Sequence, residues 1–262
     1  MSGRRIPVYQ VDAFASRVFT GNPAAICPLE EWLPDEQMQA IAAENNLAET
    51  AFFVRNGGGY KLRWFTPAVE VDLCGHATLA SAFVILNDLM PGERSVSFET
   101  KSGRLTVTRE GDLYSMDFPS RPPGECTPCA GLVDALGGKP EAVLAARDYF
   151  VVYGSEEALR ALRPNMSALM DIDRFAVIAT APGKEVDFVS RFFAPAKGVP
   201  EDPVTGSAHC SLIPYWSKRL GKSRLHAYQV SPRGGELWCE DCGERVSMSG
   251  MAVRFLQGTI FL

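Results

Sequence analysis

The sequence predicts an α+β protein made of two similar halves, in each of which a curved sheet wraps one apolar helix. Two observations support this prediction. A duplicated segment, whose copies lie about half the chain apart, indicates the two halves. Each half also has one long apolar helical pattern among many short strand patterns, as expected for a sheet that packs around its own helix.

The duplication is visible in two pairs of segments. Residues 63–68 are RWFTPA and residues 191–196 are RFFAPA, an offset of 191 − 63 = 128 positions. Residues 74–77 are CGHA and residues 205–208 are TGSA, an offset of 205 − 74 = 131, so the second copy carries three extra residues and Glu70 falls opposite Glu201. Related halves usually pack about a pseudo-twofold axis, so we expect a small-molecule site in the cleft between them, facing two helix starts.

The first half is expected to span residues 1–120, with one long buried helix. Strand patterns cover residues 8–14, a short run after the turn at 21–23, 47–54, 60–66 and most of 95–118. A first helix is expected from Pro34 or Asp35 to about Asn45. The long helix begins at Cys74 or Gly75 and continues to Leu86, with apolar residues on most of its sides.

The second half, residues 121–262, repeats this order after a Pro/Gly-rich linker at residues 119–128. Short helices are expected at 141–146 and 156–162, strands at 176–179 and 187–194, a helix that begins at Gly206, and further strands from 225 to the end. The last of these strands, at the end of the chain, is expected to be able to pack on the first half.

Composition excludes several classes of protein. A net charge of −5 argues against a nucleic-acid surface, which needs a basic stripe. No apolar run approaches the roughly 18 residues of a membrane span, and no uninterrupted apolar stretch follows Arg4 and Arg5, so we expect a cytoplasmic protein without a secretory signal. No glycine-rich nucleotide-binding motif and no closely spaced pair of histidines occurs, so neither a nucleotide cofactor nor a metal is expected from the motifs.

The seven cysteines suit reduced thiols better than a disulfide framework. Two Cys-x-x-Cys pairs, at 126/129 and 239/242, together have the ligand count of a structural zinc site. More than a hundred residues separate them, and neither has a third ligand nearby. We therefore interpret them as loop cysteines, with zinc as the alternative.

Glu49 and His76 are the first candidates for chemistry. Glu49 lies in an apolar segment, where a carboxyl is suited to taking and giving a proton near neutral pH, although an outward-facing position on a strand is equally compatible with the pattern. His76 follows the helix-opening Gly75, where it can donate to a substrate oxygen or share a proton with a carboxylate. The helix start is expected to lower the pKa of His76 and favour a neutral ring; a capping or packing role is the alternative.

The second half offers Asp202 and Ser207. Asp202 precedes a proline, so its side chain should project from the loop, where it can hold an ammonium group or orient His76. Ser207 has a hydroxyl and a backbone N–H suited to an anion, with plain helix capping as the alternative. Cys74 sits at a helix start that favours a thiolate base. Its duplicated position holds Thr205, which cannot act as a base, so a two-thiol mechanism is disfavoured.

Five segments resemble the phenazine-biosynthesis (PhzF-like) family, within the diaminopimelate epimerase-like superfamily. They are residues 11–14 (VDAF), 19–24 (FTGNPA), 47–52 (LAETAF), 72–78 (DLCGHAT) and 198–208 (GVPEDPVTGSA). The resemblance implies two pseudo-symmetric domains, each a barrel-like, mostly antiparallel sheet around a central helix. It also implies a homodimer and a cofactor-free isomerase whose best-known member acts on a dihydro-hydroxyanthranilic acid.

The same resemblance places the catalytic roles on four residues, which are Glu49 as the proton shuttle and His76, Asp202 and Ser207 as supporting groups. Substrate contacts are expected at Asn22, Cys74, Gly75, Ala77, Thr205 and Gly206. The function expected is proton transfer on a small amino-acid-like or cyclic carboxylate. The alternatives are an epimerase or racemase that uses Glu49 with Cys74, and a binding protein without catalysis.

Overall fold

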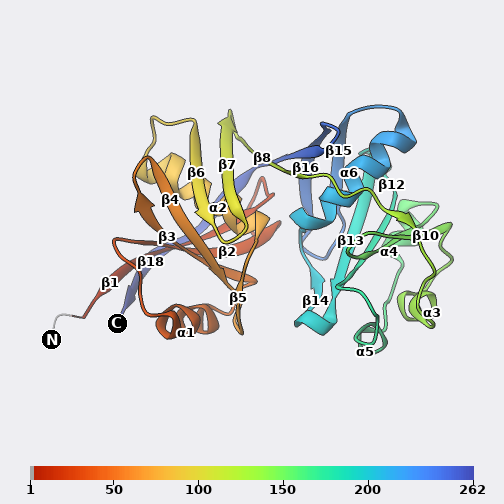
Figure 1. Ribbon diagram of the computed structural model, residues 1–262, viewed down its shortest axis with the longest axis horizontal. Coiled ribbons are helices and arrows are strands. Elements are labelled where there is room, and N and C mark those ends of the chain that lie inside the picture. Colours follow the sequence, from red (N-terminus) through yellow and green to blue (C-terminus); the bar gives the residue numbers. More distant parts are fainter. Residues whose placement is uncertain (1–2) are drawn as a thin grey trace. The chain divides into compact units, whose positions relative to one another are not determined.

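The computed structural model describes residues 3–262, and the chain divides into two compact units. Unit 1 comprises Met1–Asp117 and Ser249–Leu262, and unit 2 comprises Phe118–Met248. Both units combine many strands with few helices, so the predicted α+β class is confirmed (Figure 1).

Unit 1 is a sheet that surrounds one apolar helix. Its strands are β1 (Arg5–Ala13), β2 (Asn22–Leu29), β3 (Glu49–Asn56), β4 (Gly59–Phe65), β5 (Glu70–Val71), β6 (Ser95–Thr100), β7 (Gly103–Glu110), β18 (Ala252–Phe261) and β8 (Leu113–Pro119), which runs into unit 2. Its helices are α1 (Asp35–Asn45), α2 (Gly75–Val84) and the π-helical turn η1 (Ile85–Leu89).

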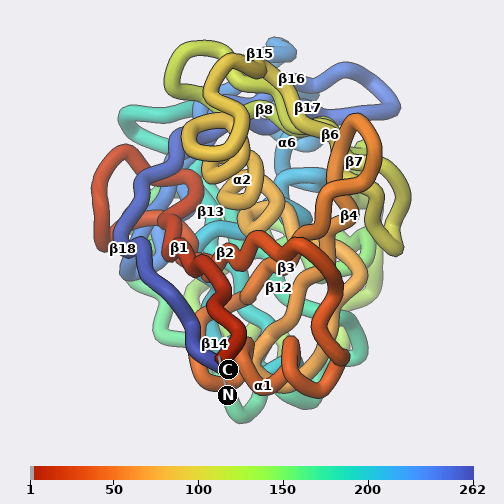
Figure 2. Tube along the Cα trace, turned by 90° about the vertical axis from the view of Figure 1, so that its left-hand side faces the viewer, coloured from red at the N-terminus to blue at the C-terminus, as the bar shows by residue number. Residues whose placement is uncertain are grey.

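Helix α2 is the centre of unit 1. It contacts β1, β2, β3, β7 and β18, and Figure 2 shows it among these strands. Eight of its ten residues are buried, as the apolar pattern on most of its sides predicted. A helix that is apolar all round gains stability by burial against every neighbour, so its start is held in a fixed place.

Unit 2 has its own strands and helices. The strands are β9 (Gly124–Glu125), β10 (Ala142–Ala145), β11 (Tyr149–Val152), β12 (Val177–Pro182), β13 (Phe188–Ala194), β14 (Val199–Asp202), β15 (Arg224–Gln229), β16 (Gly235–Asp241) and β17 (Arg245–Gly250), the last of which ends in unit 1. The helices are α3 (Leu132–Leu136), α4 (Glu156–Arg160), α5 (Met166–Leu169), the 3-10 turn η2 (Pro195–Lys197) and α6 (Gly206–Leu220).

The strand pairings of unit 1 recur in unit 2. The antiparallel pairs β1–β2, β3–β4 and β6–β7 correspond to β10–β11, β12–β13 and β15–β16. The parallel pairs β2–β3 and β4–β6 correspond to β11–β12 and β13–β15. The long helix follows the fifth strand of each series, α2 after β5 and α6 after β14. The repeat seen in the sequence is therefore a repeat of topology.

An equivalent Arg–Glu ion pair occurs in each unit. Arg63 Nε and Nη2 donate to the two Glu70 oxygens at 2.7 and 2.9 Å, and Arg191 donates to Glu201 with the same two distances. In each unit this two-pronged bond ties the end of one strand to the segment that leads into the long helix. Such planar pairs fix geometry as well as charge.

The helix predicted at residues 141–146 is wrong. Residues Ala142–Ala145 form β10, which pairs antiparallel with β11. The run is only four residues long after Pro140, too short for a stable helical turn of its own, and pairing with the neighbouring strand satisfies its backbone groups instead. Strand β11, whose residues are all buried, was not predicted because a short apolar run has no distinguishing period.

Within residues 3–262, no helix is long and apolar enough to cross a membrane.

The two ion pairs differ in burial, which predicts a difference in stability between matched variants. The Arg191 and Glu201 side chains are 10% and 14% exposed, and Arg191 also donates to the carbonyls of Leu159 and Leu162. Glu201→Ala should lower the free energy of unfolding by about 3 kcal/mol because it leaves a buried arginine unpaired. Glu70→Ala should cost only about 1 kcal/mol, since Arg63 keeps Asp35 as a partner. Urea unfolding of both variants measures this; equal losses would contradict it.

Candidate active site

The long helices begin in the same way. Cys74 precedes α2 with an extended backbone (φ −141°, ψ 111°), and Thr205 precedes α6 with a similar one (φ −117°, ψ 100°). Neither side chain accepts a hydrogen bond from its helix. The first-turn N–H groups, which have no partner within a helix, are therefore not capped by these side chains and lie at the positive end of each helix dipole. Such a helix start favours a carboxylate or another anion.

Glu49 and His76 meet at the start of α2. Glu49 is the first residue of β3 and His76 is the second residue of α2, and Glu49 Oε2 lies 3.0 Å from His76 Nε2. The side chains are 18% and 6% exposed, so the pair is largely shielded from water. Pairing of β3 with β2, in which Glu49 lies opposite Ala24, fixes the position of the carboxyl. The structure thus brings together the two residues that the sequence singled out in the first half.

The other ring nitrogen of His76 has two neighbours. The Asn22 amide nitrogen lies 3.2 Å from His76 Nδ1, and Cys74 Sγ lies 3.5 Å from it. An amide can turn by 180° and offer either a donor or an acceptor, so Asn22 can serve both protonation states of the ring. The opposite ring nitrogen, Nε2, faces Glu49 at a distance over which a proton can pass between imidazole and carboxyl.

The expectation that the helix start lowers the pKa of His76 is wrong. Burial disfavours the charged ring, but the neighbouring Cys74 sulfur and the Glu49 carboxylate outweigh it, and the pKa of His76 lies well above its ordinary value of 6.5. Cys74 also differs from the expectation of a thiolate. Burial and the negative charge of Glu49 raise the pKa of its thiol, although His76 acts in the opposite sense.

Glu49, Cys74 and His76 have ligand atoms within 4.8 Å of one another, and they are the one such group of three or more in residues 3–262. A metal ion bound to this group would need a deprotonated Cys74 and a neutral His76, so its binding would release protons. The two Cys-x-x-Cys pairs do not come together: Cys126 and Cys129 pack against the apolar core of unit 2.

Asp202 and Thr205 are joined in unit 2. Thr205 Oγ1 donates a short hydrogen bond to Asp202 Oδ2. The Gln229 amide connects to both residues: its nitrogen donates to Thr205 Oγ1 at 3.1 Å and to the Asp202 carbonyl at 2.8 Å, and its oxygen accepts from the Thr205 N–H at 2.9 Å. Gln229 is fully buried at the end of β15. No sequence pattern pointed to Gln229, because a single glutamine at the end of a strand is ordinary.

Ser207 is the second residue of α6, one position inside the helix, so it is not the N-cap. Its hydroxyl oxygen accepts a hydrogen bond from Arg147 Nη2 at 3.2 Å. Arg147 was missed by the sequence analysis because it lies sixty positions away. Of the remaining expected contacts, Gly75 and Gly206 open the two helices, and Ala77 is fully buried in the first turn of α2, so it can offer only backbone atoms.

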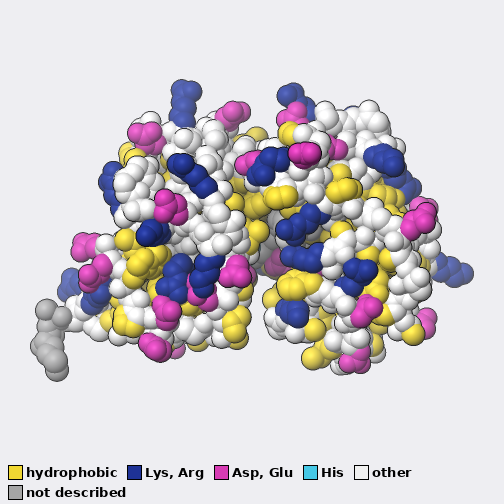
Figure 3. All heavy atoms as spheres, in the orientation of Figure 1, with side chains coloured by type: hydrophobic (Ala, Val, Ile, Leu, Met, Phe, Trp, Pro, Cys, Tyr) yellow, Lys and Arg dark blue, Asp and Glu magenta, His cyan; other side chains and the backbone are white. Residues whose placement is uncertain are grey.

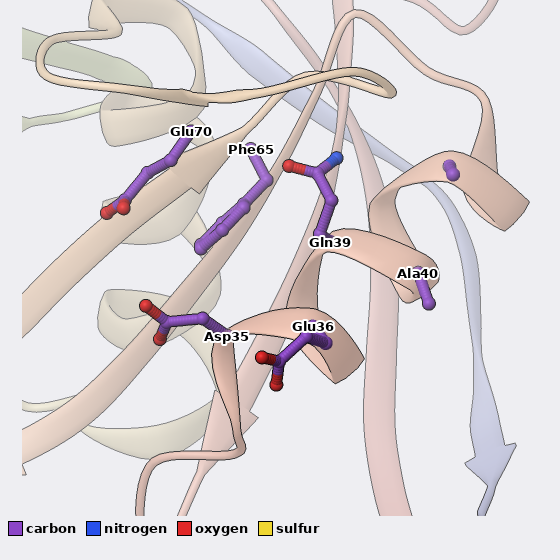
Figure 4. Close-up of a pocket in the computed structure, with 7 residues that line it drawn as sticks. Asp35, Glu36, Gln39, Ala40, Phe65 and Glu70 are labelled. Atoms are coloured by element: carbon purple, nitrogen blue, oxygen red, sulfur yellow. The ribbon is translucent and has the colours of Figure 1, made fainter.

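A hollow of about 560 Å³ lies elsewhere in unit 1, beside α1 and β4. It is lined by Asp35, Glu36, Gln39, Ala40, Ala43, Phe65 and Glu70 (Figure 4). None of the expected site residues lies there. Its acids Asp35 and Glu70 are held by Arg63, and these hydrogen bonds keep both carboxyl pKa values low, so they are poorly suited to proton transfer.

Comparison with known proteins gives a consistent family. Residues 11–258 match the family model described as "Phenazine biosynthesis-like protein". An uncharacterised isomerase of Pseudomonas aeruginosa is 52% identical over 257 residues, which is 98% of this chain and 99% of that protein. A phenazine biosynthesis-like domain-containing protein of Homo sapiens is 38% identical over 286 residues, with 98% and 99% covered.

Comparison with solved structures gives the same fold family as the sequence comparisons. A PhzF-family phenazine biosynthesis protein of Enterococcus faecalis matches with a TM-score of 0.97 and 50% identity over 99% of this chain and all of that one. A hydroxyproline epimerase from Agrobacterium vitis shares only 9% identity, with a TM-score of 0.62 over 99% of this chain and 93% of that chain. The second comparison shows a shared fold, which confirms the epimerase-like architecture.

His76 and His209 should have widely different pKa values. His76 should stay protonated at neutral pH, whereas burial lowers the pKa of His209 to about 4. A raised folded-state pKa makes His76 stabilise the fold fully below its unfolded pKa near 6.5, and this stabilisation is lost as the pH rises through the folded value. NMR of the imidazole C–H groups between pH 3 and 10 measures both midpoints, with His76→Gln identifying one signal. A His76 midpoint below 6.5 would contradict the pairing with Glu49.

Proposed function

This chain belongs to the phenazine biosynthesis-like (PhzF) family, whose curated relatives include proteins named isomerases, and on that premise we propose that it is an isomerase that moves a proton by acid/base catalysis. The substrate proposed is a small amino-acid-like or cyclic carboxylate. Glu49 removes a proton from a carbon next to an activating group and returns it to another carbon. No cofactor enters this scheme.

The observation that carries the proposal is the 3.0 Å contact between Glu49 Oε2 and His76 Nε2. When the carboxylate of Glu49 takes a proton from carbon, it becomes a neutral acid, and the electron pair left behind spreads into the activating group of the substrate. His76 stabilises the carboxylate before and after this step by donating to it. Glu49, now a neutral acid, then gives a proton to a different carbon, so the enzyme ends unchanged; exchange of the Glu49 proton with solvent between the two steps introduces solvent hydrogen into part of the product.

The remaining residues have binding roles in this proposal. The first-turn N–H groups at Gly75 and Gly206 are suited to carboxylate or enolate oxygens, whose charge grows as the proton leaves. Asp202, held by Thr205, is suited to an ammonium group. The cleft between the halves and the homodimer, both expected from the sequence and its resemblance, stay predictions.

The second candidate is an epimerase that uses Glu49 with Cys74. It is supported by the position of Cys74, whose Sγ lies 3.5 Å from His76 Nδ1 in the same group of side chains. The raised pKa of Cys74 disfavours it, as does Thr205 at the duplicated position. A binding protein without catalysis would bind ligand and exchange no proton.

Glu49→Gln should abolish proton exchange. The protein would be incubated in D₂O with a panel of cyclic and aromatic amino acids, including dihydroanthranilate-type compounds, and followed by NMR and mass spectrometry. We expect deuterium at a carbon of at least one compound, and a loss of about 10²-fold or more in Glu49→Gln. Glu44→Gln, at an exposed position of α1, is the matched control and should exchange at the wild-type rate. Full exchange by Glu49→Gln would remove Glu49 as the base.

Cys74→Ser separates the two candidates. Under the isomerase proposal it should keep exchange within about tenfold of wild type, because serine fills nearly the same space and the thiol does not carry the proton. The product should show a shifted double bond. Loss of exchange as large as in Glu49→Gln, together with an inverted centre in the wild-type product, would favour the epimerase.

A further inference from the structure

We propose that Gln229 is a positioning residue that fixes the side chain of Asp202 by way of Thr205. The inference rests on the proposed function, in which Asp202 binds an ammonium group of the substrate, and it names the residue that prepares Asp202 for that role. Gln229 is the last residue of β15 and is fully buried, so it acts through its neighbours and not on the substrate.

The orientation of the Gln229 amide is fixed by backbone groups. Its oxygen accepts from the Thr205 N–H at 2.9 Å, and its nitrogen donates to the Asp202 carbonyl at 2.8 Å. A backbone N–H can only donate and a carbonyl can only accept, so turning the amide by 180° would break both bonds. The amide nitrogen is consequently the atom that faces Thr205 Oγ1, at 3.1 Å.

Thr205 connects this fixed amide to the carboxyl of Asp202. Its Oγ1 accepts from Gln229 and donates to Asp202 Oδ2. Asp202 is thus held at two points, since Gln229 binds its carbonyl and Thr205 binds its carboxyl. A carboxyl that is already fixed does not have to be ordered when a ligand binds, and this favours affinity.

The hydrogen bonds of Gln229 lie in the interior of unit 2. Gln229 is 0% exposed and Thr205 is 7% exposed, whereas charged side chains are spread over the drawn face of the same unit (Figure 3). Water competes little for bonds in such a place, and a buried amide that lost its partners would be costly. The three bonds of Gln229 therefore restrict the arrangement of Thr205 and Asp202.

The counterpart of Gln229 in unit 1 is a threonine. The registers of the pairs β4–β6 and β13–β15 match, and they place Thr100 where unit 2 has Gln229. Thr100 donates to the Gly103 carbonyl at 2.7 Å, within its own turn. The counterpart of Asp202 is Val71, since each follows the glutamate of its Arg–Glu pair. The acid and the glutamine therefore occur together in unit 2, and unit 1 has other residues at both positions.

A serine bond that both units share ties the same segment to the sheet. Ser231 donates to the Pro203 carbonyl at 2.8 Å, and Ser102 donates to the Asp72 carbonyl at the same distance. Each serine lies in the turn after its strand, and each accepting carbonyl lies in the segment that precedes the long helix. Because this bond is present in both units, the additional bonds of Gln229 point to a task specific to unit 2, which is the placement of Asp202.

Gln229→Met tests the proposal on the full-length protein without any substrate. Methionine fills nearly the same space but offers no comparable hydrogen bond. Three-bond coupling constants, measured by NMR on isotope-labelled protein, give the χ1 rotamer of Asp202. We expect one rotamer in the wild type and a mixture of rotamers in Gln229→Met. A mixture in the wild type, or a single unchanged rotamer in the folded variant, would overturn the proposal.

Matched variants separate the placement of Asp202 from a general loss of stability. Gln39→Met removes another glutamine-to-carbonyl bond, which is 2.8 Å long and ends on Thr66, and should leave the Asp202 rotamer as in the wild type. Thr205→Val should loosen Asp202, whereas Thr205→Ser keeps the hydroxyl and should preserve the single rotamer. A loosened Asp202 in Gln39→Met, or a fixed one in Thr205→Val, would contradict the proposal.

A second substitution covers a failure of Gln229→Met to fold. Gln229→Glu is nearly isosteric and keeps the acceptor for the Thr205 N–H, but its carboxylate loses both donors. Asp202 should again leave its single rotamer, and a single unchanged rotamer in this variant would overturn the proposal in the same way.

Kinetics connect the placement of Asp202 to the reaction. With a compound that exchanges in the deuterium assay, Gln229→Met should raise KM about tenfold and keep kcat within about threefold, because Asp202 contributes binding and not proton transfer. A fall in kcat at unchanged KM would contradict this role. No exchange by the wild type, with the rotamers as expected, would reject the isomerase and retain Gln229 as the positioning residue; exchange with an unchanged Asp202 rotamer in Gln229→Met would do the reverse.

Discussion

Each unit of this protein depends on a helix that is buried along its body and left without a side-chain cap at its start. Burial fixes where α2 and α6 begin, and the extended residues Cys74 and Thr205 leave the first-turn N–H groups without a side-chain cap. The repeated Arg–Glu pairs hold the segments that lead into these helices. The fold therefore supplies the same electrostatic feature twice.

The two helix starts have diverged in the side chains around them. Unit 1 places a carboxyl, an imidazole and a thiol together, and their mutual charges keep the proton on His76. Unit 2 places Ser207 against Arg147 and Asp202 against Thr205, with no buried acid–histidine pair among these contacts. One start is suited to moving a proton, and the other to holding charged groups in place.

Much of this was predictable from the sequence. The duplication could be found because Arg63, Glu70 and Gly75 recur at a nearly constant offset, and the fold class followed from one apolar helix in each half. Helix 141–146 was predicted wrongly, since strand pairing decides the state of a four-residue apolar run. The pKa of His76 could not be predicted, because it depends on Glu49 and Cys74, which come from different elements and meet only in the fold. Arg147 and Gln229 were missed for the same reason: each acts through a partner distant in sequence.

The most direct test of the central claim is the fate of a labelled proton. A compound found to react would be prepared with deuterium at the reacting carbon and converted in H₂O. A single base should return part of that deuterium to the new carbon, because Glu49 is largely shielded from water. Complete loss of the label, with inversion at the original carbon, would contradict the account and point to two bases.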